Sequence, residues 1–416
     1  FGAGSPPTVA QADAARFLQQ ASFGPTLAEI DRVASMGYDA WISEQFRRPA
    51  SSHLEIHRAI HAEMTPHLGG EARDVNCEFS YPCQLTRHDT WWQIAVRGDD
   101  QLRQRVAFAL SQFFVISEIS DNVGYSQQAI SDYYDTLAVH GLGNFRTLLE
   151  EVTLHPLMGR YLGMLQNEKA DPRTNTEPDE NFAREVMQLF SIGLVELNID
   201  GTPRLDANGR TIPTYDNARI THLARALTGW NFSNATRWWN WEDDVKLAGL
   251  VSNMTPWTTA QGEIYHDKGE KVLLRGATIP AGGTARGNLQ AALDNLFNHP
   301  NVGPFLARHL IQRLVTSNPS PAYVRRVAER FNNNGAGVRG DMQAVVRAVL
   351  MDPEARDTAL VRQYGYGKVK EPMLRFAQVL RAFQAEGQSV STPAGPATRS
   401  LLRNRGVGVD MAQSLM

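Results

Sequence analysis

Carboxylate, amide and guanidinium side chains occur close together in segment 178–190 of this 416-residue chain. The apolar positions recur at i, i+4, i+7 and i+8, namely Phe182, Val186, Leu189 and Phe190. This spacing predicts an amphipathic helix. On that helix Glu180 and Arg184 share one line of the surface, and Asn181 and Glu185 share another. Polar groups beside a buried stripe indicate either a functional site or a polar junction between helices.

Two interpretations of this segment stay open. The carboxylates of Glu180 and Glu185 are suited to act as acid and base in a hydrolysis, or to bind a divalent metal. Alternatively, Glu180 and Arg184 form an i,i+4 ion pair, and Glu185 binds an arginine of a neighbouring helix. Asn181 favours a site, because a purely solvated ion-pair face does not need an amide. The four catalytic candidates are therefore Glu180, Asn181, Arg184 and Glu185.

An imidazole stands beside a carboxylate at His266 and Asp267, in a segment without helical periodicity. Loops commonly present catalytic groups, and histidine titrates near neutral pH. We therefore predict His266 and Asp267 as two further catalytic residues, and expect them to face the polar side chains of segment 178–190. By contrast, His155 and His299 each precede a proline, where a ring nitrogen often caps a helix end. The zinc-hydrolase motif His-Glu-x-x-His does not occur, and no metal is predicted at this site.

Tryptophans concentrate around residues 230–257, at Trp230, Trp238, Trp239, Trp241 and Trp257. Flat apolar rings beside hydrogen-bonding groups suit sugars, which offer a CH face and a rim of hydroxyls. The same composition suits a protein interface, since Trp often anchors binding there. Core packing is the third possibility. We predict Trp230, Trp238, Trp239 and Trp241 as substrate-binding residues.

Three aspartates lie near glycines or turn residues, Asp200, Asp206 and Asp216. Their spacing is only loosely similar to a calcium loop, because the bidentate glutamate at position 12 is missing. Asp-Gly and Asn-Gly also favour tight turns, and we predict turns here. Phosphate-binding, dinucleotide-binding and nucleophile-elbow motifs are absent from the sequence, which leaves the identity of any cofactor unknown.

Composition narrows the class of protein. A net charge of −3 argues against a nucleic-acid partner, and no apolar run is long enough to span a membrane. The only cysteines, Cys77 and Cys83, are close together, which predicts a disulfide and an oxidising compartment. We therefore expect a periplasmic, cell-surface or secreted protein, and the opening residues resemble a mature or trimmed end.

Helical periodicity dominates, so the predicted fold is all-α. The expected helices are 9–21, 26–35, 39–47, 86–97, 101–117, 126–139, 144–164, 177–195, 217–229, 285–298, 302–315, 320–333, 340–351 and 368–385. Segment 101–117 is apolar nearly all round and should lie at the centre. Residues 205–212 predict a small hairpin around Asn208-Gly209. We expect one large domain over 8–416, with 198–284 as an irregular insertion and 1–7 as a flexible segment.

Six segments together resemble the DUF1800 family. They are 102–117, 155–159, 178–190, 224–230, 266–269 and 308–315, and they occur in the family's order. The similarity runs from about residue 12 to the end of the chain. It implies a bacterial, typically exported protein, often encoded beside a sulfatase-like partner. It implies no established activity.

Two functional hypotheses follow. The first is an exported protein that binds or hydrolyses an extracellular polymer, most plausibly a polysaccharide, with Glu180 and Glu185 as acid and base. The second is a non-catalytic cell-surface or scaffold protein that holds a protein partner through its Trp-rich segment. Convergence of the carboxylates and the Trp-rich segment on one cavity would favour the first hypothesis.

Overall fold

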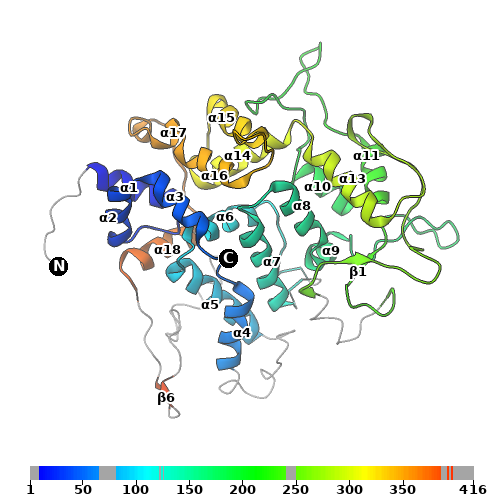
Figure 1. Ribbon diagram of the computed structural model, residues 1–416, viewed down its shortest axis with the longest axis horizontal. Coiled ribbons are helices and arrows are strands. Elements are labelled where there is room, and N and C mark those ends of the chain that lie inside the picture. The colour runs from blue at the N-terminus through cyan, green and yellow to red at the C-terminus, as the bar shows by residue number, and fades with distance from the viewer. Residues whose placement is uncertain are drawn as a thin grey trace.

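The computed structural model describes residues 9–64, 81–120, 123–124, 126–239, 250–385, 391–392 and 395–396. Helices dominate this part of the chain, which confirms the predicted all-α fold (Figure 1). In the N-terminal half they are α1 Val9–Ala21, α2 Leu27–Met36, α3 Tyr38–Arg47, α4 His53–Met64, α5 Tyr81–Arg97, α6 Gln101–Ser111, α7 Gln127–His140, α8 Phe145–Leu154, α9 Pro156–Leu162 and α10 Asn181–Gln188. In the C-terminal half they are α11 Asn217–Ala226, α13 Ala285–Phe297, α14 Val302–Leu314, α15 Pro321–Asn332, α16 Met342–Met351, α17 Pro353–Arg356 and α18 Pro372–Ala382. None of the helices in the described ranges is long and apolar enough to cross a membrane.

Strands occur only as short antiparallel pairs within the described residues. They pair as β1 Trp230–Asn231 with β2 Thr255–Pro256, β3 Lys271–Val272 with β4 Thr278–Ile279, and β5 Ser391–Thr392 with β6 Gly395–Pro396. Two of these pairs, β1–β2 and β3–β4, lie in the predicted irregular segment. Strand β3 packs on α11, and β1 follows α11 closely in the chain.

Helix α6 lies at the centre, as predicted from its nearly continuous apolar character. It contacts α1, α3, α5, α7 and α14, and all its residues except Arg103 and Ser111 are buried. The helix ends at Ser111, so the predicted end at 117 was wrong. After it the chain turns and buries Phe114 against Phe145 and Phe190, with ring centroids 6.2 and 5.3 Å apart. This tertiary packing overrides the local helical pattern.

The predicted helix 144–164 is two helices, because the chain bends at His155. The Nδ1 atom of His155 accepts a hydrogen bond of 3.2 Å from the Leu157 backbone N–H, and Pro156 opens α9. Proline is favoured at the first helical position because its missing N–H would be unpaired there anyway. His299 likewise accepts from the Asn301 N–H, at 3.2 Å. Both histidines therefore cap backbone groups, as the sequence suggests.

Helix α4 was missed because its buried stripe is made of histidines. His53, His57 and His61 recur at i, i+4 and i+8, and all three are buried. Their hydrogen bonds replace aliphatic contacts: His53 Nε2 lies 2.9 Å from Gln104 Oε1, and His57 Nδ1 lies 3.0 Å from Ser131 Oγ. A search for aliphatic periodicity does not detect such a stripe.

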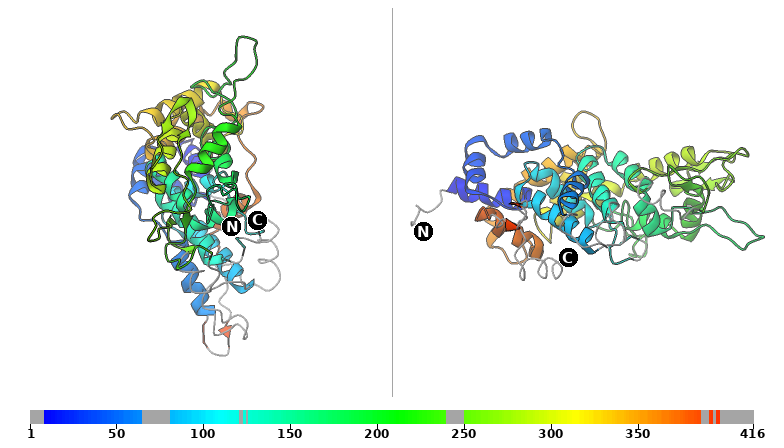
Figure 2. Two further views of the ribbon diagram at one scale, coloured as in Figure 1. Left: turned by 90° about the vertical axis from the view of Figure 1, so that its right-hand side faces the viewer. Right: turned by 90° about the horizontal axis from the view of Figure 1, so that it is seen from below.

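The segment between α10 and α11 projects from the body as a long loop in all the ribbon views (Figures 1 and 2). Leu205 and Thr211 pair across it, and Asp206 Oδ1 accepts from the N–H groups of Asn208 and Arg210, at 2.8 and 2.9 Å. Asp216 caps α11 by accepting from the Arg219 N–H. These aspartates therefore build turns and a helix cap.

Within the described ranges, the larger of two clusters of buried apolar residues includes residues from Ala14 to Ala355. A smaller cluster around Trp91 and Trp92 packs α5 against α18. The predicted domain boundaries, 8–416 with an insertion at 198–284, stay a prediction.

Candidate functional site

Helix α10 is shorter than the predicted 177–195, and this changes the setting of Glu180. Glu180 occupies the N-cap position of Asn181–Gln188, where its side chain makes no capping hydrogen bond. Its Oε1 accepts a 2.7 Å bond from Thr221 Oγ1, and its Oε2 lies 3.4 Å from Arg184 Nη2. The i,i+4 ion pair expected from the sequence is therefore present. The side chains of Glu180 and Arg184 are 37% and 42% exposed. Because water screens such a pair, the ion pair contributes only about 0–1 kcal/mol to stability.

One turn further along α11, Arg225 binds Asp267. Arg225 Nε and Nη2 donate to the two carboxylate oxygens, at 2.9 and 3.1 Å. Lys271 Nζ lies 3.3 Å from the same carboxylate and is fully buried. Burial by itself raises the pKa of Asp267, but Arg225, the Gly269 N–H and Lys271 together hold it below its usual value. Asp267 is therefore a charged group in a buried network.

Glu180 and Asp267 thus bind the same helix. Thr221 and Arg225 are i and i+4 on α11, so their side chains lie next to each other on one face. Segment 178–190 and the loop that contains Asp267 therefore both bind this face of α11, each through a different α11 side chain.

His266 belongs to the interior. It is 1% exposed, and its Nδ1 lies 2.9 Å from the Thr228 carbonyl oxygen, so Nδ1 carries the proton and donates. Its Nε2 accepts from Asn288 Nδ2 at 2.8 Å. Burial is the main cause that lowers the pKa of His266, which favours this neutral form. Both ring nitrogens are engaged, so the imidazole positions the loop and is not directed toward Glu180.

Asn181 and Glu185 lie on the other line of α10. Asn181 is exposed, and its side-chain Nδ2 is 3.4 Å from Asp179 Oδ2. Glu185 is half-buried, and its Oε2 atom is buried without a hydrogen-bond partner among the described residues. Burial raises the pKa of Glu185, although nearby Arg184 opposes the shift. Of the predicted candidates, Glu185 alone combines a raised carboxyl pKa with an unsatisfied oxygen.

Sequence reasoning missed Asn167, which joins α10 to the Trp-rich segment. Its Oδ1 accepts from the Asp179 N–H at 2.8 Å, and its Nδ2 donates to the Asp179 carbonyl oxygen at 3.0 Å. Its own carbonyl oxygen accepts from the Gly229 N–H at 2.8 Å. Asn167 is buried, although it lies in a run of polar residues that reads as a surface loop.

The neighbours of Asn167 bind the aromatic residues. Gln166, which has a left-handed φ of 59°, donates through its backbone N–H to the Trp230 carbonyl oxygen. Its side-chain amide donates to the Trp238 carbonyl oxygen. Glu168 Oε1 accepts from the Trp238 indole N–H at 2.6 Å, and the Lys169 N–H donates to the carbonyl oxygen of Tyr265. Residues 166–169 therefore fix the Trp-rich segment beside the start of α10.

The predicted substrate-binding tryptophans have different settings. Trp230 is fully buried, with the Arg286 guanidinium 4.9 Å from its ring centroid. Trp238 is 4% exposed and stacks on Tyr265, with ring centroids 4.0 Å apart and an interplanar angle of 15°. Trp239 is 56% exposed, which is the setting a ligand-binding ring needs. Trp241 lies outside the described residues.

Comparison with known proteins gives one result. A family model described as "Protein of unknown function (DUF1800)" matches residues 16–413. The chain belongs to the DUF1800 family. Neither the curated proteins nor the solved structures give a match. The description of the DUF1800 family carries no activity, so function has to be argued from the site.

The predicted disulfide of this DUF1800 chain is not tested. Cys83 is buried, with its Sγ atom 3.6 Å from His61 Nδ1. Cys77 lies outside the described residues, so the Cys77–Cys83 bond stays a prediction.

Proposed function

We propose that this protein is exported and binds an extracellular polysaccharide at an aromatic platform formed by Trp238, Trp239, Trp257 and Tyr265. The exposed ring of Trp239, held beside the immobilised Trp238, is the observation that carries the proposal. The ring centroids of Trp238 lie 6.2 Å from those of both Trp239 and Trp257. An aromatic side chain fixed before binding loses little entropy when a ligand arrives.

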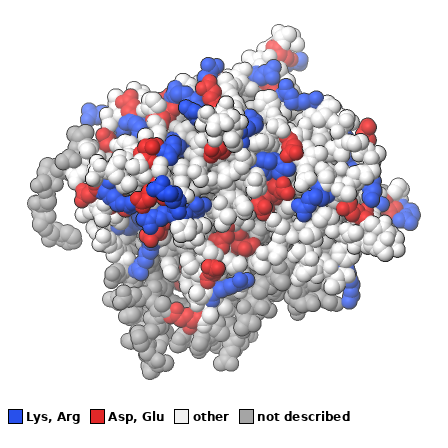
Figure 3. Space-filling model, viewed as in Figure 1, with Lys and Arg blue, Asp and Glu red and all other residues white. Residues whose placement is uncertain are grey.

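The chemistry of the platform suits a sugar. Rings offer an apolar face to the CH groups of a pyranose, and Tyr and Trp also carry polar groups at their edges. Glu168 supplies a carboxylate next to the indole of Trp238, and carboxylates accept well from sugar hydroxyls. On the face shown in Figure 3, Lys, Arg, Asp and Glu side chains are interspersed, and no extended basic surface favours a nucleic acid.

Hydrolysis of the polymer is a second candidate function, and Glu185 is the observation in its favour. A general acid needs a carboxyl group that holds its proton near the working pH, and burial raises the pKa of Glu185 in that direction. Glu180 is bound to Arg184 and Thr221. It is the second carboxylate that the acid–base mechanism would use.

A sedimentation assay tests the binding proposal. The wild-type protein is mixed with insoluble cellulose, chitin or peptidoglycan, and the bound fraction is measured after centrifugation. We expect at least one polymer to retain the protein, and Trp239→Ala to weaken retention roughly tenfold or more, because an aromatic anchor contributes on the order of 2 kcal/mol. Phe383→Ala is the matched control, since Phe383 is an exposed aromatic residue at the C-cap of α18, outside the platform.

Equal retention of Trp239→Ala and the wild type would contradict the proposal. Lack of binding to every polymer would also contradict it, and would leave the protein-partner hypothesis as the better explanation of the exposed ring. Circular dichroism of each variant checks that the fold is intact.

A further inference from the structure

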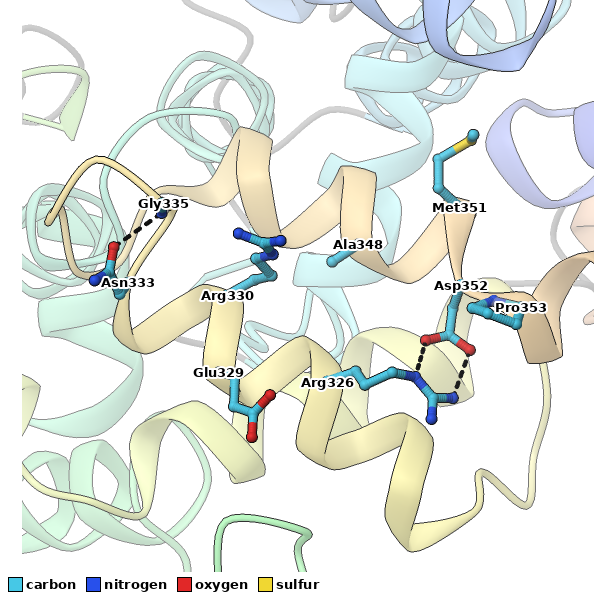
Figure 4. A pocket seen from close by; sticks show the side chains of 9 residues that line it. All are labelled: Arg326, Glu329, Arg330, Asn333, Gly335, Ala348, Met351, Asp352 and Pro353. Atoms are coloured by element: carbon cyan, nitrogen blue, oxygen red, sulfur yellow. Dashed lines mark hydrogen bonds and ion pairs between the residues drawn. The ribbon is translucent and has the colours of Figure 1, made fainter.

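A pocket lies between α15 and α16, and none of the aromatic platform residues lines it (Figure 4). It has a volume of about 570 Å³. This falls within the range of roughly 300–1,000 Å³ typical of pockets for small molecules. Arg326 and Arg330 reach it from α15, and Ala348 lines it from α16.

Arg326 is already neutralised by protein carboxylates. Its Nε and Nη2 donate to the two oxygens of Asp352, at 2.7 and 2.8 Å, and Nη2 also lies 2.9 Å from Glu354 Oε1. Asp352 is buried and caps α17, so this ion pair is part of the framework. Arg326 therefore forms a fixed wall of the pocket.

Arg330 lies one turn further along α15 and has no such partner. Within the described part of the chain its side chain makes no hydrogen bond and no ion pair. In Figure 4 its guanidinium extends toward α16 and Ala348. Glu329 also lines the pocket, but among the described residues no ion pair joins it to Arg330, so the guanidinium N–H groups stay available to a ligand.

The loop after α15 gives the pocket a rigid wall with a further donor. The Oδ1 atom of Asn333 accepts from the N–H groups of Gly335 and Gly337, at 2.8 and 2.9 Å. The Nδ2 group, at the other end of the same amide, is left to donate to a ligand. Gly335 has a φ of 104°, and a Cβ there would lie 3.3 Å from Arg330 Nη1. A glycine at this position therefore leaves room for the guanidinium.

We propose that this pocket binds a small organic oxyanion, a molecule with a carboxylate or phosphate group, with Arg330 as its anchor. The planar guanidinium donates two parallel hydrogen bonds to such a group, and Asn333 Nδ2 supplies a third. Ala348 and Pro353 offer apolar surface to the body of the ligand. This site is independent of the polysaccharide proposal.

Calorimetric titration of the full chain with glucuronate and, separately, with inorganic phosphate tests the site. We expect one of the two probes to bind, and which one binds identifies the source of the oxyanion. Arg330→Gln should weaken that binding about tenfold or more, since hydrogen bonds to charged groups contribute about 1.5–3 kcal/mol. Arg330→Lys should weaken it less, because lysine keeps the charge but loses the planar fork.

Arg325→Gln is the matched control, because Arg325 is exposed on the same helix and does not line the pocket. It removes the same charge and should leave the affinity unchanged. Failure of both probes to bind at millimolar concentration would overturn the proposal. Equal weakening by Arg325→Gln and Arg330→Gln would also overturn it, since that result indicates non-specific attraction to the helix.

Discussion

Glu180 and Asp267, far apart in the sequence, are held on adjacent turns of one face of α11. Thr221 binds the first carboxylate at 2.7 Å, and Arg225 binds the second through two hydrogen bonds. The hydrogen bond between Thr221 and Glu180 is exposed, whereas the ion pair between Arg225 and Asp267 is largely buried. This difference in burial predicts that the two carboxylates contribute very differently to stability.

Asp267→Asn should lower the free energy of unfolding by about 3 kcal/mol, because it leaves the charges of Arg225 and buried Lys271 without their carboxylate. Glu180→Gln should lower it by less than about 1 kcal/mol, because its ion pair with Arg184 is exposed. Urea denaturation followed by circular dichroism measures both values. Similar values for the two variants would show that burial is not what separates these carboxylates.

Asn167→Ala should destabilise the protein by about 2 kcal/mol. The substitution removes two hydrogen bonds to the backbone of Asp179 and leaves buried groups unpaired. Asn298→Ala is a suitable control, because the exposed Asn298 side chain bonds only to the Asp294 carbonyl oxygen of its own helix. Unfolding midpoints that fall equally in both variants would argue against a joining role for Asn167.

The sequence predicts local relationships better than distant ones. The predicted helix 302–315 agrees with Val302–Leu314, because an aliphatic stripe defines it. The Glu180–Arg184 pair was predicted because i,i+4 spacing is a property of the helix itself. The Arg225–Asp267 and Asn167–Asp179 contacts join residues from separate elements, and periodicity carries no information about them. The burial of Trp238 and the exposure of Trp239 likewise depend on the fixed segment 166–169.

Acid should destabilise the packing of α4. Burial is the main cause that lowers the pKa of His53 from 6.5 to about 4 and that of His57 to about 3. The unfolded chain therefore takes up protons at higher pH than the folded chain does. The stability that these neutral rings contribute is complete above about pH 6.5 and is lost as the pH falls toward 4 and 3.

Asp135, which accepts from the Leu54 N–H, opposes this trend, because burial raises its pKa from 3.8 to about 6. The downward pKa shifts of His53 and His57 are together larger than the upward pKa shift of Asp135. The stability of the folded protein should therefore fall in acid. Unfolding midpoints at about pH 7 and about pH 4 measure the loss, and His57→Gln should reduce the difference between them. An unchanged difference would show that His57 does not titrate with unfolding.

Glu185→Gln separates catalysis from architecture. Because burial raises the pKa of Glu185, its charged form is disfavoured in the folded protein above the carboxyl's ordinary pKa. The neutral amide should therefore keep or increase stability at neutral pH, and should abolish any hydrolysis of the retained polymer. Reducing-sugar release and thermal unfolding measure the two effects. Lost stability with unchanged sugar release would assign Glu185 to the framework.

Fluorescence titration tests the central claim most directly, because the platform contains the protein's own reporters. Soluble oligosaccharides of the retained polymer should change the tryptophan emission of the wild type in a saturable manner. Trp239→Ala should raise the Kd roughly tenfold or more, while Phe383→Ala leaves it unchanged. A saturable change with the same Kd in Trp239→Ala and the wild type would contradict the account, because the ligand would then bind away from the aromatic platform.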